Sequence, residues 1–240
     1  MIANSWERYY DRLKLHTAKE YSALPHKPFA NRYPTYIPKQ QLLEYFHDYV
    51  KEFEIEPHLN TEVSTIRQGS NSWEVTASTG QFSAAHVVIC TGLVRKPLIP
   101  EWKGSSSFKG KLIHSIDYKN PVQFLNKKVL VVGMGNSGAE IALDLALADI
   151  NPSLSVRGEV NIVPRDFLGR PTQKTAQLLS IFPNWVGDNL GRLVQQFVIG
   201  DLSPFGLKTP DIAPAKQLRE TGKTPILDIG TIDQIKAGKI

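Results

Sequence analysis

The feature that most constrains this chain is the stretch 128–146, in which three glycines separate two apolar segments. The run 129–132 before the glycines is short and β-branched, which is typical of a strand buried on both faces. After the glycines, Ile141, Leu145 and Ala148 recur at helical spacing. The stretch therefore predicts a strand, a tight turn and a helix.

The glycines of this turn, Gly133, Gly135 and Gly138, match the pattern G-x-G-x-x-G. Gly133 permits the turn, Gly135 lets a pyrophosphate approach the backbone, and Gly138 lets the helix pack closely on the strand. The phosphates would accept hydrogen bonds from the free N–H groups at the helix start. The pattern predicts a dinucleotide site, and the alternative is a glycine-rich turn that binds no ligand.

A candidate for nucleotide choice is Arg157, which lies nineteen positions after Gly138, at the expected end of the next strand. An acidic residue there would hold the ribose 2′-hydroxyl of NAD, whereas a cation favours the 2′-phosphate of NADP. The alternative is a solvated arginine at a strand end, and Arg165 is a second, weaker candidate. We expect NADPH to be preferred.

The composition is that of an ordinary globular chain, with 240 residues, 41% hydrophobic and 21% charged residues. The net charge of +5 is scattered, so a phosphate-bearing small ligand explains it as well as nucleic acid would. Cys90 is the only cysteine, which excludes an intrachain disulfide and fits the cytoplasm. No apolar run reaches membrane-spanning length. We expect a soluble cytoplasmic protein without nucleic-acid, membrane or metal binding.

The rest of the chain predicts alternating strands and helices. Residues 39–53 place their apolar side chains on one helical face. Three strands are expected at 61–66, 73–77 and 86–90, the last buried and ending in Thr91 and Gly92 at an edge where ligands commonly bind. Beyond the glycine turn, two strands are expected at 154–157 and 160–163 and a helix at 188–199, whereas 204–225 has no assignment.

The segment before the glycine turn carries a family-specific pattern. Phe108, Gly110, His114 and Tyr118 match F-x-G-x-x-x-H-x-x-x-Y, so the chain resembles the class B flavin-dependent monooxygenases. Four further segments resemble the YUCCA-type indole-3-pyruvate branch of that family, namely 9–16, 33–36, 39–41 and 164–169. The resemblance covers nearly all of the chain to about residue 169 and continues more loosely to its end.

The resemblance implies FAD and NADPH as cofactors, with reduced flavin using O2 to transfer one oxygen atom to a small organic substrate. The protein would position the cofactors and exclude water. The resemblance places Asn136 and Ser137 beside the three glycines at NADP. It gives His114 and Tyr118 a structural role in docking the NADP domain, and no catalytic residue is assigned. It places six residues at FAD, namely Trp6, His16, Lys39, Gln40, Thr91 and Gly92.

The expected fold is α/β, with two Rossmann-like dinucleotide-binding domains and the NADP domain inserted into an incomplete FAD domain. The expected parts are a partial FAD domain, a linker with the signature, an NADP domain and a return to the FAD domain, at 1–95, 96–125, 126–222 and 223–240. No FAD fingerprint precedes Trp6. We therefore expect the chain as given to bind NADPH but FAD poorly.

Three functions compete at this point. The first is a flavin-dependent monooxygenase, complete or truncated, acting on indole-3-pyruvate or on an amine or sulfide. Leu15 and His16 replace the Thr-Asn of amine-oxygenating relatives, which favours a YUCCA-like substrate. The second is a non-catalytic NADP-binding module that has lost flavin binding. The third, a pyridine-nucleotide disulfide oxidoreductase, is disfavoured because that chemistry needs a reactive cysteine pair.

Overall fold

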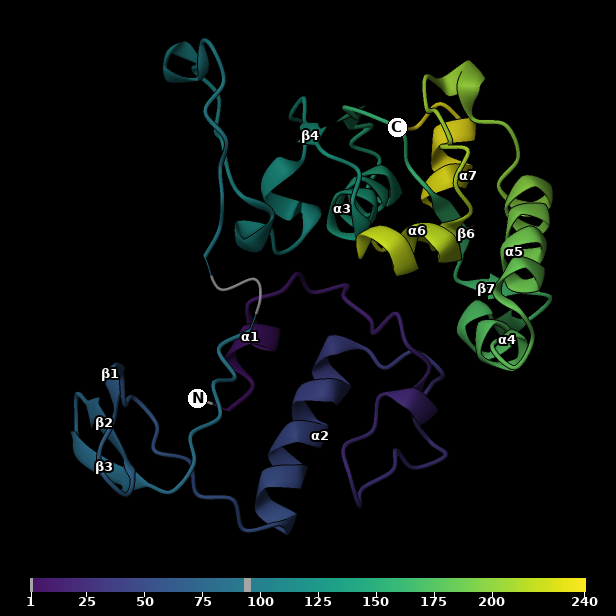
Figure 1. Cartoon of the computed structure of the whole chain (residues 1–240). Coiled ribbons are helices and arrows are strands. Elements are labelled where there is room, and N and C mark those ends of the chain that lie inside the picture. Colours follow the sequence, from purple (N-terminus) through teal and green to yellow (C-terminus); the bar gives the residue numbers. More distant parts are fainter. Residues whose placement is uncertain (1, 93–95) are drawn as a thin grey trace. The chain divides into compact units, whose positions relative to one another are not determined.

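The computed structural model describes residues 2–92 and 96–240 (Figure 1). The chain divides into two compact units. Unit 1 joins Met1–Arg8 to Gln40–His114, and unit 2 joins Tyr9–Lys39 to Ser115–Ile240. The mixture of helices and strands confirms the α/β class.

Unit 1 contains one long helix and one small sheet. Its elements are α1 (Asn4–Glu7), α2 (Lys39–Glu52), β1 (Val63–Gln68), β2 (Trp73–Ala77), β3 (Gly80–Ala84) and the 3-10 turn η2 (Ser105–Ser107). The sheet is antiparallel in the order β1-β2-β3. The helix expected at 39–53 is confirmed as α2, which buries Leu42, Leu43 and Tyr45.

The third strand of this sheet is not the one that the sequence predicts. β3 pairs with β2 through Ala77↔Gly80 and Val75↔Phe82, so residues 78 and 79 form a two-residue hairpin loop. Residues 86–90 form no strand, and Val88 and Ile89 are 81% and 71% exposed. The expectation of a buried strand there is wrong, because an apolar run becomes a strand only where a neighbour completes its hydrogen bonds, and no described residue does so.

Unit 2 contains three pairs of short strands. β4 (Leu130–Val132) runs parallel to β5 (Ser153–Ser155), and β6 (Ile162–Pro164) runs parallel to β9 (Ile226–Asp228). β7 (Asp166–Phe167) and β8 (Arg170–Pro171) form a hairpin. The helices are α3 (Asn136–Leu147), α4 (Thr172–Leu179), α5 (Asn184–Val198), α6 (Pro214–Thr221) and α7 (Thr231–Lys236), with 3-10 turns η1 (Lys19–Tyr21), η3 (Ser115–Asp117), η4 (Pro121–Phe124) and η5 (Ser203–Phe205).

The expected strand, turn and helix around the glycines are confirmed as β4 and α3, and β5, β6 and α5 match the expected elements with shifted bounds. The burial of β4 on both faces is wrong, since Leu130 and Val132 are 60% and 55% exposed. Side chains alternate along a strand, so Val131 faces α3 while the other two point to the opposite face. No described residue covers that face.

The core of unit 2 lies around the parallel pair β6–β9. Its buried members are Met134, Ala139, Val160, Ile162, Ile199, Leu202, Leu207, Ile226, Ile232 and Ile235. α3 packs against β4, β9 and α7, and α5 packs against β6 and α6. Residues 223–240, which were expected to belong to the FAD domain, lie in unit 2 and pack beside α3. The domain bounds of the whole protein stay a prediction. No helix in 2–92 or 96–240 is long and apolar enough to cross a membrane.

Three buried amide side chains connect the elements of this core. Asn161 Nδ2 donates to Gln217 Oε1 on α6 at 2.7 Å, and Gln195 Nε2 on α5 donates to Asn161 Oδ1 at 3.2 Å. Gln195 also donates to the Ile162 carbonyl at 2.9 Å. Because buried polar groups need partners, Asn161 specifies how α5 and α6 sit against β6.

Substitution Asn161→Ala should lower the free energy of unfolding by about 2–4 kcal/mol, because it removes the donor to Gln217 Oε1 and to the Ile212 carbonyl and one of the two acceptors of Gln195 Nε2. The matched control is Asn189→Ala, an exposed asparagine on α5, which should change stability by less than about 0.5 kcal/mol. Urea unfolding of both variants measures the difference. Equal stabilities would contradict the role of the network.

Candidate functional site: the glycine turn and the adjacent basic cleft

The turn between β4 and α3 has the geometry of a dinucleotide-binding turn. Gly133 ends the strand at φ 97°, a conformation that favours glycine. A Cβ built on Gly138 would collide with the carbonyl oxygen of Gly133, so only glycine lets α3 approach β4 this closely. A Cβ on Gly135 would meet no heavy atom within 4 Å. Gly135 therefore borders open space, which suits the approach of a phosphate group.

Backbone donors at the start of α3 face this space. The first N–H groups of a helix have no partner within it, and the N-cap Gly135 supplies no side-chain cap. The residues expected at NADP thus surround the turn, with one qualification. Asn136 Oδ1 already accepts the Leu227 N–H of β9 at 2.8 Å, so this side chain also ties α3 to the second strand pair.

Arg157 lies at the same sheet edge as Gly133. β4 and β5 are parallel with Val132 opposite Ser155, and the Gly133 N–H donates to the Ser155 carbonyl at 2.9 Å. Arg157 follows the end of β5 by two residues and is exposed. Because the carboxyl ends of parallel strands share an edge, Arg157 extends from the edge that carries the glycine turn.

A buried acidic side chain on α3, Glu140, holds a distant segment of the chain. The Glu140 carboxylate, 3% exposed, lies 2.5 Å from His16 Nε2 and accepts a hydrogen bond from Tyr10. Burial, and next the Glu140 charge, raise the pKa of Tyr10 well above its usual range. The contacts of Glu140 with Tyr10 and His16 fix segment 10–16 on the helix, because a buried carboxylate needs partners.

Tyr118, the last residue of the signature, is anchored in the same way. Its hydroxyl donates to Asp144 Oδ2 at 2.7 Å, and its ring stacks on Phe124 at a centroid distance of 5.6 Å. Burial, and next the hydrogen bond to Asp144, raise the pKa of Tyr118 strongly. Elsewhere in the signature, a Cβ on Gly110 would overlap the Phe108 ring, and His114 is half-buried. Tyr118 contacts α3 through its hydrogen bond to Asp144.

A basic cleft opens beside Glu140. It has a volume of about 230 Å³ and is lined by Arg12, Lys14, His16, Glu140, Arg165 and Ile229. Arg12, Lys14 and Glu140 are missed by the sequence analysis. A usable signal existed, because Asn136, Glu140 and Asp144 lie four residues apart and so share one face of a helix whose other side chains, apart from Ser137, are apolar. Polar side chains in such a stripe need partners on the element that covers it.

Comparison with known proteins now decides the family. The sequence model described as "Flavin-binding monooxygenase-like" matches residues 4–200. The chain belongs to this family.

Among curated members, the chain is similar to the probable indole-3-pyruvate monooxygenase YUCCA8 of Arabidopsis thaliana, with 39% identity over 251 residues. The indole-3-pyruvate monooxygenase YUCCA6 of the same plant is 38% identical over 249 residues. Both matches cover all of this chain but only 59% and 60% of the relatives. The chain thus spans about three fifths of their length.

Solved structures agree on the fold of this flavin-binding monooxygenase-like chain. A flavin-containing monooxygenase from Stenotrophomonas maltophilia has a TM-score of 0.61 at 24% identity, covering 66% of this chain and 48% of that one. A bacillithiol disulfide reductase from Staphylococcus aureus has a TM-score of 0.59 at 17% identity, covering 78% and 55%. At these identities the likeness concerns the fold alone. It therefore does not support a disulfide oxidoreductase function for a chain with one cysteine.

The residues expected at FAD are divided between the units. Trp6, Gln40, Thr91 and Gly92 belong to unit 1, whereas His16 and Lys39 belong to unit 2. Trp6 packs near Phe46 at a ring distance of 6.4 Å, and Lys39 Nζ donates to the Tyr9 carbonyl at 2.9 Å. Gln40, Thr91 and Gly92 are exposed. In the described residues, segment 86–92 does not form a strand, turn and helix like β4 and α3. The assignment of these six residues to FAD therefore stays a prediction.

The buried tyrosines predict an alkaline loss of stability. In the unfolded chain tyrosines ionise near about pH 10, whereas the raised pKa values of Tyr10 and Tyr118 keep them protonated in the fold. The unfolded state then binds fewer protons, so stability falls as the pH rises above about 10, by up to about 1.4 kcal/mol per pH unit for each tyrosine.

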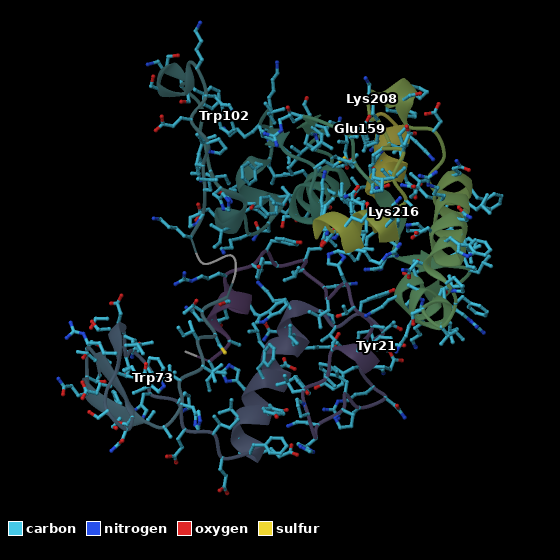
Figure 2. All side chains as sticks on the ribbon, viewed as in Figure 1. Tyr21, Trp73, Trp102, Glu159, Lys208 and Lys216 are labelled. Atoms are coloured by element: carbon cyan, nitrogen blue, oxygen red, sulfur yellow. The ribbon has the colours of Figure 1, made fainter. Side chains whose placement is uncertain are left out.

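Tyr118→Phe should lower the free energy of unfolding at neutral pH by about 1–3 kcal/mol through the lost hydrogen bond, and it should flatten the alkaline slope. Tyr21→Phe, at an exposed position labelled in Figure 2, serves as control. Urea unfolding between about pH 8 and 11.5 measures both slopes. The same slope in Tyr118→Phe as in the unmodified chain would contradict the assignment.

Proposed function

We propose that this chain forms the NADPH-binding part of a flavin-dependent monooxygenase that uses O2 to oxygenate a small organic substrate. The observation that carries the proposal is the strand, glycine turn and helix formed by β4 and α3, in a chain of the flavin-binding monooxygenase-like family. When bound, NADPH supplies a hydride and FAD supplies the oxygen chemistry.

The residues of the glycine turn have separate tasks in this proposal. The N–H groups at the start of α3 bind the pyrophosphate, helped by the positive end of the helix. Arg157 pairs with the 2′-phosphate, and its exposed guanidinium has no partner in the described structure that would compete. Asn136 and Gly138 hold the helix against β9 and β4, so that the donors keep their direction.

The larger arrangement follows the family. We propose an NADP domain inserted into an FAD domain, with residues 96–125 as the linker and Tyr118 fixing that linker to α3 through Asp144. For the substrate we propose an indole-3-pyruvate-like acid, because the curated relatives are named as indole-3-pyruvate monooxygenases.

Two alanine substitutions separate binding from folding. Gly135→Ala places a methyl group in open space, so stability should be retained while NADPH affinity falls by about tenfold or more, because the pyrophosphate can no longer approach. Gly138→Ala forces α3 away from Gly133 and should reduce both stability and affinity. Calorimetric titration with NADPH and thermal unfolding measure the two effects. Unchanged NADPH affinity in Gly135→Ala would refute a nucleotide at this turn.

Nucleotide choice depends on Arg157 in this proposal. The unmodified chain should bind NADPH more tightly than NADH, and Arg157→Ala should narrow that gap by about 1.5–3 kcal/mol, since a charge-assisted pair is lost. Lys208→Ala removes an exposed cation elsewhere in unit 2 and should leave the ratio unchanged. Titrations with both nucleotides give the ratio. Equal affinity of the unmodified chain for NADPH and NADH would contradict the proposal.

A further inference from the structure

The basic cleft of unit 2 carries three cations, one of which, Arg165, is paired with Asp166. Arg12, Lys14 and Arg165 line it together with Glu140, but Glu140 is already paired with His16. Lys14 Nζ and the Arg12 guanidinium make no ion pair with a described residue. Cations gathered in one cleft repel each other and raise the local concentration of anions. The balance of charge therefore favours a negatively charged ligand.

Arg12 gives the clearest sign of a missing partner. Its Nη1 atom is buried and has no hydrogen-bond partner, and the same is true of His16 Nδ1 in the same wall. A buried donor that stays unpaired destabilises the fold, and more so when the group is charged. A ligand oxygen in the cleft would remove this cost for Arg12.

Arg165 is held in place for the same task. Its guanidinium carbon lies 3.9 Å from the centre of the Tyr36 ring, and its Nε donates to Asp166 Oδ2 at 3.3 Å. The Tyr36 hydroxyl donates to the other oxygen of Asp166 at 2.6 Å, which fixes the carboxylate in turn. The guanidinium is thus oriented by Tyr36 and Asp166 at the wall of the cleft.

The cleft lies where ligands bind in α/β folds. Arg165 directly follows β6 and Ile229 directly follows β9, and these strands are parallel with Pro164 opposite Asp228. Both residues therefore stand at the carboxyl edge of the pair, outside which ligands bind in open α/β sheets. Glu140 lies two residues after Gly138 and adds α3 to the wall.

The size of the cleft limits the ligand. About 230 Å³ corresponds to roughly eight water molecules, which admits one end of a small molecule but not a dinucleotide. The pyrophosphate has its own backbone donors at the glycine turn. We propose that Arg12, Lys14 and Arg165 bind the carboxylate of a small 2-oxo acid. The interpretation of this acid as the substrate rests on the proposed function.

The test compares an acid with its neutral counterpart. Phenylpyruvate and 1-phenylpropan-2-one share a benzyl ketone and differ by a carboxylate in place of a methyl group. Calorimetric titration of the full chain at low salt should show phenylpyruvate binding at least about tenfold more tightly. Arg12→Gln and Arg165→Gln should each weaken phenylpyruvate by about tenfold and leave the ketone unchanged, since only the acid uses the guanidinium pair.

The matched control is Lys208→Gln, whose exposed side chain is labelled in Figure 2 and does not line the cleft. It should change neither affinity. Thermal unfolding reports whether each variant folds, and Arg12→Lys, which keeps the charge, should recover part of the phenylpyruvate affinity. Equal binding of acid and ketone, or equal effects of Arg12→Gln and Lys208→Gln, would overturn the proposal.

NADPH and inorganic pyrophosphate are titrated with the same samples. If Arg12→Gln weakens these two ligands as much as phenylpyruvate, the cleft belongs to the nucleotide and the carboxylate subsite is rejected. If NADPH binds but phenylpyruvate does not, the subsite is rejected while the proposed function stands. If phenylpyruvate binds but NADPH does not, the subsite stands and the proposed function is rejected.

Discussion

The close approach of Gly138 to the Gly133 carbonyl fixes α3 on β4, and the rest of unit 2 depends on this contact. A side chain at residue 138 would displace the helix because its Cβ has no room, whereas one at residue 133 would strain the turn because Gly133 has positive φ. With the helix so placed, its first N–H groups border the open space beside Gly135. One steric constraint thus determines both how closely α3 packs on β4 and the direction of the N–H groups that we propose bind phosphate.

The same helix organises the unit through a polar stripe. Asn136, Glu140 and Asp144 are each four residues apart, and their partners are the Leu227 N–H, His16 and Tyr118. These partners come from β9, from the segment before α2 and from the residue that follows η3. Because each polar group is buried or half-buried, a misplaced partner would leave it unsatisfied. The stripe therefore specifies which segments lie against α3, whereas the apolar face supplies the burial.

The sequence could predict β4, the glycine turn and α3, because a local pattern of apolar period and glycine spacing determines them. It failed at 86–90, where Val88 and Ile89 have the composition of a buried strand but no described neighbour to pair with. Strand pairing is a property of two segments, so composition at one of them does not decide it. The cleft could not be predicted for a similar reason. Arg12 and Arg165 are 153 positions apart in the sequence, and only the fold brings them to one wall.

In the proposed arrangement, backbone donors and side-chain donors bind different anions in this unit. At the glycine turn the donors are backbone N–H groups, which add no net charge. Because the backbone supplies these donors, no side chain is needed at Gly135. At the cleft the donors are charged guanidinium and ammonium groups on segments that the Glu140–His16 pair and the Tyr36–Asp166 pair hold in place. Because the pyrophosphate requires none of these cations, they remain available for a second anion. A cofactor and an acidic substrate could then bind to one unit without competing for the same ligands.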